Sequence, residues 1–415
     1  MSNLMNLINH LVDFFIYFYH MKSILDKNFR GKNVLVRVDF NVPLDKKQNI
    51  IDDSRIRASL PTIKKLLNDK AGVILMSHLG RPVCKDKRFS LKPIVSRLQE
   101  LLGVQIHFSN DCVGTSAERH ASNLKNGEVL LLENLRFYKE EKLGDMEFSK
   151  KLSKLADVYV NDAFGAAHRK HSSTSVVSSF FSSEKYLGLL LKSEINNLQK
   201  ALNSPKRPFT AIIGGSKITG KIDVILSLVD KVDNLIIGGG MAYTFINAMG
   251  GETGKSIVEK DKLKIAKVIM KKAKESGVKF LLPIDSVNAD NFSNNANINN
   301  SDILNIDPSY MGLDIGNKSV LIFSKVIENS KTIIWNGPMG VFEMSNFEKG
   351  TKMICEAVCR STSNGAFSLI GGGDSVSAIK KFKLSDKVSY ISTGGGAMLE
   401  YLEGKELPGI AAILE

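Results

Sequence analysis

The segment TAIIGGSKITGK at residues 210–221 contains the pattern that decides the fold. A short apolar, β-branched run leads into a glycine-rich turn, and a stretch with helical periodicity follows. Similar units recur from about residue 33 onward. Alternation of buried strands with amphipathic helices is typical of parallel sheets covered by helices. The sequence therefore predicts an α/β fold.

The apolar runs fall into two groups along the chain. Those of the first half are 34–38, 73–76, 129–132 and 158–160, with helical periodicity at 54–67 and 91–102. Those of the second half are 210–213, 235–237, 280–282, 332–335, 367–370 and 390–392. A chain of 415 residues is also long enough for two domains. The helical-looking stretch 183–202 indicates a connector, and the asparagine-rich stretch 287–307 indicates a surface loop or mobile hairpin.

The charge balance favours an anionic partner. Lysine and arginine number 56 against 43 aspartates and glutamates, which gives a net charge of +13, and most of the excess lies in residues 1–190. Nucleic acid, an acidic membrane surface and a phosphorylated metabolite would all fit. The four cysteines form no CxxC pair, and the apolar residues 4–20 are interrupted by polar ones. We therefore expect no disulfide framework, zinc site or membrane span, and a reducing cytoplasm.

Basic side chains follow the runs of the first half. Ligands of open parallel sheets bind beyond the carboxyl ends of the strands, so these residues are the ones to inspect. The segments are VRVDFNVP (36–43), MSHLGRP (76–82), LLENLRFY (131–138) and VNDAFGAAHRKH (160–171), with Arg55 near the start of a helix. They bring together Arg37, Asp39, Asn41, His78, Arg81, Arg136, His168, Arg169 and His171. Because guanidinium groups bind carboxylates and phosphates in bidentate fashion, they predict a basic cleft for a small polyanion.

Glycine-rich turns follow the runs of the second half. They are IIGGSKITGK (212–221), IIGGGMA (236–242), IWNGPMGVFE (334–343), LIGGGDSVSA (369–378) and ISTGGGAM (391–398). Glycines let backbone N–H groups approach phosphates, and a helix that starts after them presents its positive end. Lys217 and Lys221 would share one helix face if a helix begins near Lys217. Asp374 is placed to hold Mg²⁺ on the phosphates, or to act as a simple N-cap.

Two familiar nucleotide signatures are not met. Residues 215–221 satisfy G-x-x-x-x-G-K, but Ile222 follows where a P-loop requires serine or threonine. No glycine cluster gives G-x-G-x-x-G, which argues against a dinucleotide-dependent dehydrogenase. A basic nucleic-acid-binding protein is disfavoured because aromatic residues make up only 7% of the chain.

The motifs taken together resemble the phosphoglycerate kinase family. The resemblance rests on VRVDFNVP, MSHLGRP, LLENLRF, VYVNDAFGAAHRKHSS, GLDIG (312–316), WNGPMGVFE, IGGGDS and STGGGAMLEYLEGKELPG, in the family's order. It implies two Rossmann-like domains joined by a hinge. The expected divisions are an extension at 1–20, a phosphoglycerate-binding domain at 21–185, a connecting helix and hinge at 186–204, a nucleotide-binding domain at 205–395, and a segment at 396–415 that returns to the first domain.

The resemblance also implies the roles of individual residues. It gives Asp39, Phe40, Asn41, Arg55, His78, Leu79, Gly80, Arg81, Arg136 and Arg169 for binding 3-phosphoglycerate or 1,3-bisphosphoglycerate. It gives Gly215, Ser216, Lys217, Lys221, Gly239, Gly240, Gly312, Asn336, Glu343, Gly372, Gly373, Asp374 and Ser375 for ADP or ATP, with Asp374 as the Mg²⁺ ligand. The expected catalytic set is Arg55, Lys217, Gly373 and Gly396.

The implied reaction needs no catalytic base. A carboxylate that attacks the terminal phosphate of ATP is already ionised near pH 7, so alignment and charge neutralisation are what the protein must supply. We expect direct in-line transfer with hinge closure, in a glycolytic cytoplasmic kinase that is a monomer and binds neither nucleic acid nor membrane. An inactive relative acting as a scaffold would have lost a transfer residue, and all are present.

Two features depart from the family pattern. Position 375 is serine where the family more often has threonine, and the hydroxyl is retained. Residues 1–20 precede the usual start, whereas the sequence from Met21 reads like a family N-terminus. We therefore expect the extension to be untranslated or dispensable.

Overall fold

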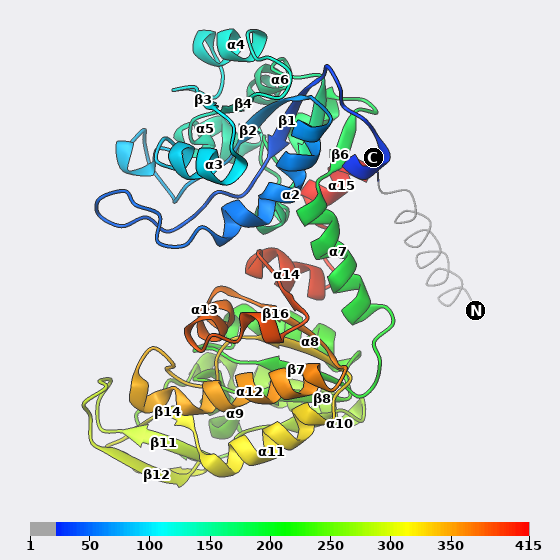
Figure 1. The fold of residues 1–415 in the computed structure, drawn as a ribbon. Helices are drawn as coiled ribbons and strands as arrows, with labels where there is room; N and C mark the ends of the chain where they lie inside the picture. The colour runs from blue at the N-terminus through cyan, green and yellow to red at the C-terminus, as the bar shows by residue number, and fades with distance from the viewer. Residues whose placement is uncertain (1–21, 415) are drawn as a thin grey trace. The chain divides into compact units, whose positions relative to one another are not determined.

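The computed structural model describes residues 22–414, and they divide into two compact units. The first unit runs to Ile195 and includes the segment from Glu406, while Asn196–Lys405 form the second. Figure 1 shows one sheet with covering helices in each unit. The expected extension at 1–20 lies outside the described residues.

A parallel six-stranded sheet forms the centre of the first unit. Its order is β3-β4-β2-β1-β5-β6. The strands are β1 (Asn33–Arg37), β2 (Gly72–Met76), β3 (Ile106–Phe108), β4 (Val129–Leu131), β5 (Val158–Asn161) and β6 (Lys185–Leu187). The four predicted runs all form strands. The two edge strands β3 and β6 were missed, because His107 and Lys185 leave them without a continuous apolar run.

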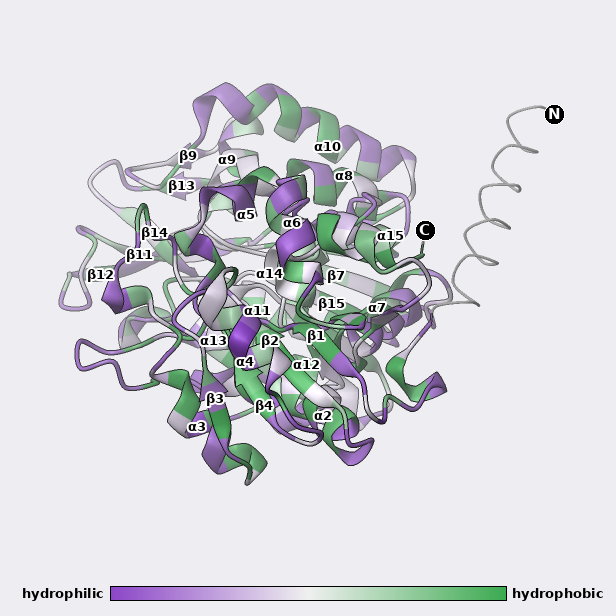
Figure 2. Cartoon of the chain, turned by 90° about the horizontal axis from the view of Figure 1, so that it is seen from above, coloured by the Kyte–Doolittle hydropathy of each residue, from purple (hydrophilic) through white to green (hydrophobic). Residues whose placement is uncertain are grey.

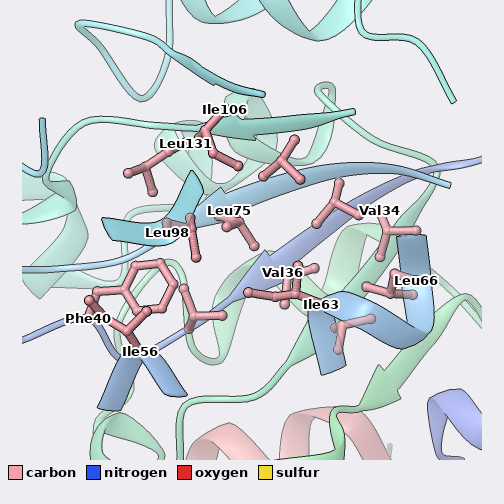
Figure 3. Packing of buried hydrophobic residues seen from close by; sticks show 14 of the residues in the cluster. Val34, Val36, Phe40, Ile56, Ile63, Leu66, Leu75, Leu98, Ile106 and Leu131 are labelled. Atoms are coloured by element: carbon pink, nitrogen blue, oxygen red, sulfur yellow. The ribbon is translucent and has the colours of Figure 1, made fainter. Parts of the chain in front are cut away.

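Helices cover this sheet with apolar faces. They are α2 (Ser54–Asn68), α3 (Ile94–Leu102), α4 (Thr115–Ser122), α5 (Lys139–Leu143) and α6 (Met146–Ser153). Ile56, Ile63 and Leu66 of α2 and Leu98 of α3 pack against the strands in one core cluster (Figure 3). Ile56, Ile63 and Leu66 are seven and three residues apart, which places them on one face of an amphipathic helix. The predicted helix at 91–102 begins three residues later than expected.

The last helix of the chain belongs to the first unit. This helix, α15 (Pro408–Leu414), contacts β5 and β6. Asn161 Nδ2 donates to the Gly409 carbonyl at 2.8 Å, and Ser178 Oγ donates to the Ala412 carbonyl at 2.9 Å. The C-terminal segment is therefore fixed to the sheet by buried polar contacts as well as by apolar packing.

The second unit contains another parallel six-stranded sheet, ordered β10-β8-β7-β15-β16-β17. Its strands are β7 (Phe209–Ile213), β8 (Asn234–Ile237), β10 (Lys279–Leu281), β15 (Thr332–Asn336), β16 (Phe367–Gly371) and β17 (Tyr390–Ile391). All six predicted runs form strands. The covering helices are α8 (Ile222–Val229), α9 (Met241–Ala248), α10 (Leu263–Glu275), α11 (Asn317–Glu328), α12 (Lys349–Ser363), α13 (Gly373–Lys381) and α14 (Gly395–Leu402). Helices such as α3 and α10 carry hydrophobic and hydrophilic segments side by side in Figure 2.

The asparagine-rich stretch forms a hairpin. Strands β11 (Asp285–Ala289) and β12 (Ile298–Asp302) pair antiparallel, and β14 (Met311–Ile315) pairs with the other side of β11. The short strands β9 (Glu252–Thr253) and β13 (Asn305–Ile306) pair separately. Exposed and partly buried residues alternate along β12, and none of its residues is fully buried. The strand therefore needs no apolar residues at regular spacing, and the sequence shows none there.

Helix α7 (Leu189–Leu202) contains the boundary between the two units. The stretch 183–202, expected to be helical throughout, begins instead with β6. Within residues 22–414, no helix combines the length and the apolar character needed to cross a membrane.

Candidate functional site

The carboxyl ends of β1, β2, β4 and β5 enclose a cavity of about 250 Å³. It is lined by Asp39, Asn41, Arg55, His78, Gly80, Arg81, Arg136, Gly165, Ala166 and Arg169, which we call the basic cavity. Parallel strands bring these residues together because their carboxyl ends meet at one edge of the sheet. Gly165 and Ala166 belong to the motif VNDAFGAAHRKH (160–171), but the sequence did not predict that they line the cavity.

Two of the predicted substrate residues do not line the basic cavity. The side chains of Phe40 and Leu79 are buried in the apolar core. Their backbone N–H groups donate inward, from Phe40 to Ser77 Oγ at 2.8 Å and from Leu79 to Asn134 Oδ1 at 3.2 Å. In this structure they anchor the loops that carry the cavity residues.

Two arginines of the basic cavity donate to main-chain carbonyl oxygens. Arg55 Nη1 donates to the Asn41 carbonyl at 2.9 Å, and Arg136 Nη1 donates to the Gly80 carbonyl. Among residues 22–414, Asp39 is the one carboxylate that lines the cavity, and its Oδ2 lies 3.4 Å from Arg55 Nη1. The lining therefore carries four guanidinium groups and one carboxylate. This excess of positive charge favours the binding of an anion.

The electrostatics of the cavity act on its own titratable groups. Burial lowers the pKa of Arg136 to about 10, and the charges of Arg169 and Arg37 act in the same direction. Burial and the surrounding arginines hold the pKa of His78 well below its usual range, so His78 is neutral at pH 7. Arg37 Nη2 lies 3.0 Å from His78 Nδ1, and because arginine only donates, the imidazole proton is on Nε2.

A buried polar chain behind the cavity was not predicted. Arg37 was expected to point into the cleft, but it is buried and its Nε donates to Ser173 Oγ at 2.9 Å. Ser173 in turn donates to Glu141, through Oγ at 2.7 Å and through its backbone N–H at 3.0 Å. Burial alone would raise the pKa of Glu141, yet His171, with Nδ1 at 3.7 Å from Oε1, the charge of Arg37 and the hydrogen bonds from Ser173 leave it below the usual value. No spacing in the sequence reveals that a glutamate of α5 supports Arg37.

Histidine 168 pairs with a cavity arginine rather than lining the cavity. Arg169 Nε donates to His168 Nε2 at 3.1 Å, and burial together with that charge lowers the pKa of His168 to about 4. Both histidines near the cavity are thus neutral, and the positive charge comes from arginine.

In the second unit, three turns at the carboxyl ends of β7, β8 and β15 pack against one another. We call residues 214–216, 238–240 and 337–340 the glycine turns. Gly239 has φ +68°, and a Cβ there would lie 2.6 Å from the Gly215 nitrogen. A Cβ on Gly337, with φ +100°, would lie 2.2 Å from the Gly214 carbonyl oxygen. Such close packing of main chains is possible only for glycine.

The expectation that Lys217 and Lys221 share a helix face is wrong. The stretch Thr219–Lys221 is a single 3₁₀ turn, and α8 begins only at Ile222. Lys217 is exposed ahead of that turn. Lys221 is partly buried, and its Nζ donates to the Gly214 carbonyl at 2.7 Å and to the Asn336 carbonyl and Oδ1 at 3.1 and 2.6 Å. Burial lowers the pKa of Lys221 to about 8, and the charge of Asp374 opposes the shift.

Two helices begin beside the glycine turns. Gly372, with φ +93°, is the N-cap of α13, so Asp374 lies inside the first turn and is not the N-cap. Ser375 Oγ accepts from the Gly337 N–H at 2.5 Å. A Cβ on Gly395 would lie 2.8 Å from Gly372 Cα, which places the start of α14, and with it Gly396, against the start of α13.

Asp374 is suited to hold a cation on a bound phosphate. Its side chain is exposed, and within residues 22–414 the structure shows no hydrogen bond or ion pair to its carboxylate. Among the same residues no group of three His, Cys, Asp or Glu side chains could hold a metal alone. One carboxylate plus substrate phosphates is the usual donor set for Mg²⁺, and this arrangement fits it.

The remaining predicted nucleotide residues lie around β14. Gly312 donates its N–H to Ser256 Oγ at 2.9 Å, and a Cβ there would lie 1.9 Å from the Tyr243 hydroxyl. Glu343 is exposed at the end of the 336–343 turn. That turn is tied to β14 by a hydrogen bond from the Val341 N–H to the Leu313 carbonyl at 2.9 Å.

Comparison with known proteins agrees with this architecture. The family model for phosphoglycerate kinase matches residues 24–405. The phosphoglycerate kinase of Porphyromonas gingivalis is 51% identical over 410 residues, covering 93% of this chain and 98% of its own. The cytosolic phosphoglycerate kinase of Triticum aestivum is 52% identical over 390 residues, covering 94% and 97%.

Solved structures show the same relationship. Phosphoglycerate kinase from Coxiella burnetii superposes with a TM-score of 0.85 at 39% identity, covering 95% of this chain and 98% of its own. The enzyme from Pyrococcus horikoshii gives 0.83 at 32% identity. The chain belongs to the phosphoglycerate kinase family, the ATP-dependent glycolytic kinases that reversibly transfer a phosphoryl group between 1,3-bisphosphoglycerate plus ADP and 3-phosphoglycerate plus ATP.

Proposed function

We propose that the basic cavity binds the glycerate substrate, either 3-phosphoglycerate or 1,3-bisphosphoglycerate. The observation that carries this proposal is a cavity of about 250 Å³ with four guanidinium groups and one carboxylate. A small molecule with a phosphate and a carboxylate matches such a lining in size and charge. Arg81, Arg136 and Arg169 would hold the anionic groups in bidentate fashion.

The uncharged residues of the cavity suit the rest of the substrate. Asp39 and Asn41 offer acceptors for the glycerate hydroxyl, and neutral His78 offers its Nε2 proton as a donor. The backbone at Phe40, Leu79 and Gly80 shapes the wall around it. Arg55 would contact the transferred group, because its side chain lines the cavity and is still 35% exposed.

We propose that the second unit binds ADP or ATP through main-chain groups. The phosphates would approach the N–H groups at Gly215, Ser216, Gly239, Gly240 and the start of α13, where the helix end is positive. Lys217, Lys221 and Asn336 would contact the same phosphates. Gly312 and Glu343, which lie near β14, would contact the nucleoside, and Gly372, Gly373, Asp374 and Ser375 would hold the terminal phosphates.

Magnesium is proposed as the metal that accompanies the nucleotide, with Asp374 as its protein ligand. When bound, Mg²⁺ would neutralise part of the negative charge of the phosphates. The role of this chain is to place Asp374 at the first turn of α13, next to the N–H groups that face the same anion. The free carboxylate of Asp374 supports this assignment.

We propose that the phosphoryl group passes directly, in line, from donor to acceptor. The 3-phosphoglycerate carboxylate is ionised at pH 7, so it attacks without a base. Charge that develops on the equatorial oxygens would be stabilised by Arg55, Lys217 and the N–H groups of Gly373 and Gly396. Because acceptor and nucleotide bind to different units, hinge closure would bring them together and exclude water, which would otherwise hydrolyse ATP.

Equilibrium binding tests the assignment of ligands to units. Arg169→Ala should weaken 3-phosphoglycerate binding at least about tenfold, since it removes a charge-assisted contact of roughly 1.5–3 kcal/mol, and leave Mg-ATP binding unchanged. Arg119→Ala on α4, an exposed residue in the same unit, is the matched control. An unchanged 3-phosphoglycerate affinity in Arg169→Ala would refute the assignment.

We further propose a cytoplasmic monomer. The support is a cytosolic wheat relative and four cysteines that are all free thiols, as a reducing compartment requires. Light scattering coupled to size-exclusion chromatography should give one mass near 45.7 kDa. A mass twice as large would overturn the monomer.

A further inference from the structure

Asn134 lies directly behind the basic cavity and is completely buried. Its Oδ1 accepts from the N–H groups of Leu79 at 3.2 Å and Arg136 at 3.0 Å. Its Nδ2 donates to the carbonyls of Leu79 and Phe89, both at 2.8 Å. Both protons of the amide and both lone pairs of its oxygen are therefore used. Every partner is main chain, and Asn134 is absent from the lining of the cavity.

These four bonds close a loop that supplies part of the cavity wall. Leu79 begins the segment that carries Gly80 and Arg81, and Phe89 ends it. The loop also folds back on itself, since a Cβ on Gly80 would lie 2.4 Å from the Phe89 ring. Asn134 joins the two ends of this loop and at the same time fixes the backbone of Arg136. One side chain thus sets the relative positions of two segments that carry cavity arginines.

Gly80 links the position of this loop to the guanidinium groups through two hydrogen bonds. Its carbonyl accepts from Arg136 Nη1, and its N–H donates to Asn41 Oδ1 at 2.8 Å. The Asn41 carbonyl accepts from Arg55 Nη1 at 2.9 Å. A shift of Gly80 would therefore move the acceptors that orient both Arg136 and Arg55. Such a shift matters because bidentate contacts to carboxylate and phosphate depend on geometry as well as charge.

We propose that Asn134 is a positioning residue for the acceptor: through the Leu79 backbone it fixes Gly80, and through Gly80 it sets the spacing of Arg55 and Arg136. The proposal rests on the assignment of the basic cavity to the glycerate substrate. It differs from a purely structural role in its consequence. Loss of Asn134 should damage acceptor binding and spare nucleotide binding, because no partner of Asn134 lies in the second unit.

The test compares Asn134→Ala and Asn134→Asp with Asn33→Ala. Asn33 lies at the opposite end of the same sheet, where its Nδ2 donates to the Ala121 carbonyl at 3.3 Å. We expect Asn134→Ala to raise KM for 3-phosphoglycerate about 10- to 100-fold, the loss typical of a misplacement of about 1 Å, with KM for Mg-ATP unchanged. Asn134→Asp keeps the two acceptor bonds and loses both donor bonds, so its effect should be intermediate. Asn33→Ala should change neither KM.

Hydrogen exchange gives a readout that does not depend on turnover. Amides of residues 78–90 should exchange faster in both Asn134 variants than in the wild type, while those of β3 and α4 should not. If Asn134→Ala does not fold, Asn134→Asp carries the same test. An unchanged KM for 3-phosphoglycerate, or equal rises in both KM values, would overturn the proposal.

Arg169→Ala separates the two possible failures. If Arg169→Ala leaves the 3-phosphoglycerate affinity unchanged, the cavity assignment itself fails. If Arg169→Ala weakens that affinity and the Asn134 variants do not, only the positioning role fails.

Discussion

The basic cavity of the first unit is built from side chains, whereas the glycine turns of the second unit are built from main chain. In the cavity, guanidinium groups are aimed by carbonyl oxygens, as Arg55 is by Asn41. In the turns, the absence of side chains lets Gly239 approach Gly215, and Gly337 approach Gly214, more closely than a Cβ would allow. Substitutions that remove side-chain atoms should therefore impair the basic cavity. Substitutions that add side-chain atoms should impair the glycine turns.

The largest effect is expected at Arg55. Arg55→Ala removes a cation proposed to contact the transferred group, so kcat should fall about 10²- to 10³-fold, as for loss of one preorganised donor. Steady-state kinetics with 3-phosphoglycerate and Mg-ATP measures it. Thermal stability should hardly change, because the side chain is partly exposed.

Arg57 provides the control for that variant. It lies one half-turn further along α2, is 52% exposed, and pairs with Asp53 at 3.0 Å away from the cavity. Arg57→Ala should retain full kcat. Comparable losses in the two variants would mean that helix α2, and not the Arg55 charge, is what catalysis requires.

The second prediction compares Gly372, the N-cap of α13, with Gly373, its first residue. Gly372 has φ +93°, and a Cβ there would lie 2.7 Å from Asn336 Nδ2, so Gly372→Ala should lose about 1–3 kcal/mol of stability. A Cβ on Gly373 meets nothing within 4 Å. Gly373→Ala should therefore fold normally and yet raise KM for ATP, because the added methyl occupies the space proposed for the phosphates.

Denaturant unfolding measures the stability of both variants, and steady-state kinetics measures their KM for ATP. A Gly373→Ala protein with wild-type stability and a KM for ATP raised about 10- to 100-fold would match the loss of one charge-assisted hydrogen bond. Unchanged ATP kinetics in Gly373→Ala would mean that the Gly373 N–H is not part of the proposed phosphate site.

The contrast between the sites also explains what the sequence could predict. Arginines at four strand ends are visible in a sequence, and parallel strands bring them together whatever the detailed loop geometry. The relation between Lys217 and Lys221 depends on a single 3₁₀ turn before α8, which residue spacing does not reveal. The edge strand β3 shows no apolar run, because His107 interrupts it and only Ile106 is buried.

Buried polar support was the least predictable part. Asn134 and Glu141 look like ordinary polar residues, and only the fold shows that they are buried and hold backbone or arginine in place. Their hydrogen bonds join segments distant in sequence, so no local pattern encodes them. Charge and glycine content thus predicted where the basic cavity and the glycine turns lie, but the groups that orient their residues required coordinates.

A third, smaller effect concerns the pH dependence of nucleotide binding. Burial lowers the pKa of Lys221 to about 8, so its charge is present below pH 8 and lost as the pH rises above it. We expect kcat/KM for ATP to decline up to about tenfold per pH unit above pH 8. Lys221→Arg should flatten this limb, because guanidinium remains charged.

The pH profile of kcat/KM for ATP, measured from pH 6.5 to 9.5, tests this expectation. Lys217→Arg, at an exposed position two residues before the 3₁₀ turn, serves as the control and should keep the alkaline decline. A decline that persists in Lys221→Arg would assign it to another group.

The last effect compares two buried carboxyl groups, one in each unit. Burial raises the pKa of Asp162 and of Asp314 to about 7, against about 3.9 in an unfolded chain. The native state therefore binds these protons more tightly, and each group's contribution to stability is present below pH 4 and lost as the pH rises through 7. The two differ in their partners, because Asp162 Oδ2 has none among the described residues, whereas Asp314 Oδ2 accepts from the Gly350 N–H at 2.7 Å.

Asparagine should consequently be tolerated at one position and not at the other. Asp162→Asn keeps the acceptor for the N–H groups of Leu190 and Leu191 and removes the buried charge, so it should gain about 2–3 kcal/mol at pH 8 relative to pH 5. Asp314→Asn turns an amide toward the Gly350 N–H and should lose about 1–3 kcal/mol at both pH values. Urea unfolding at pH 5 and 8 measures both. Equal losses in the two variants would mean that burial alone, and not the partner of each oxygen, decides how these carboxyl groups are tolerated.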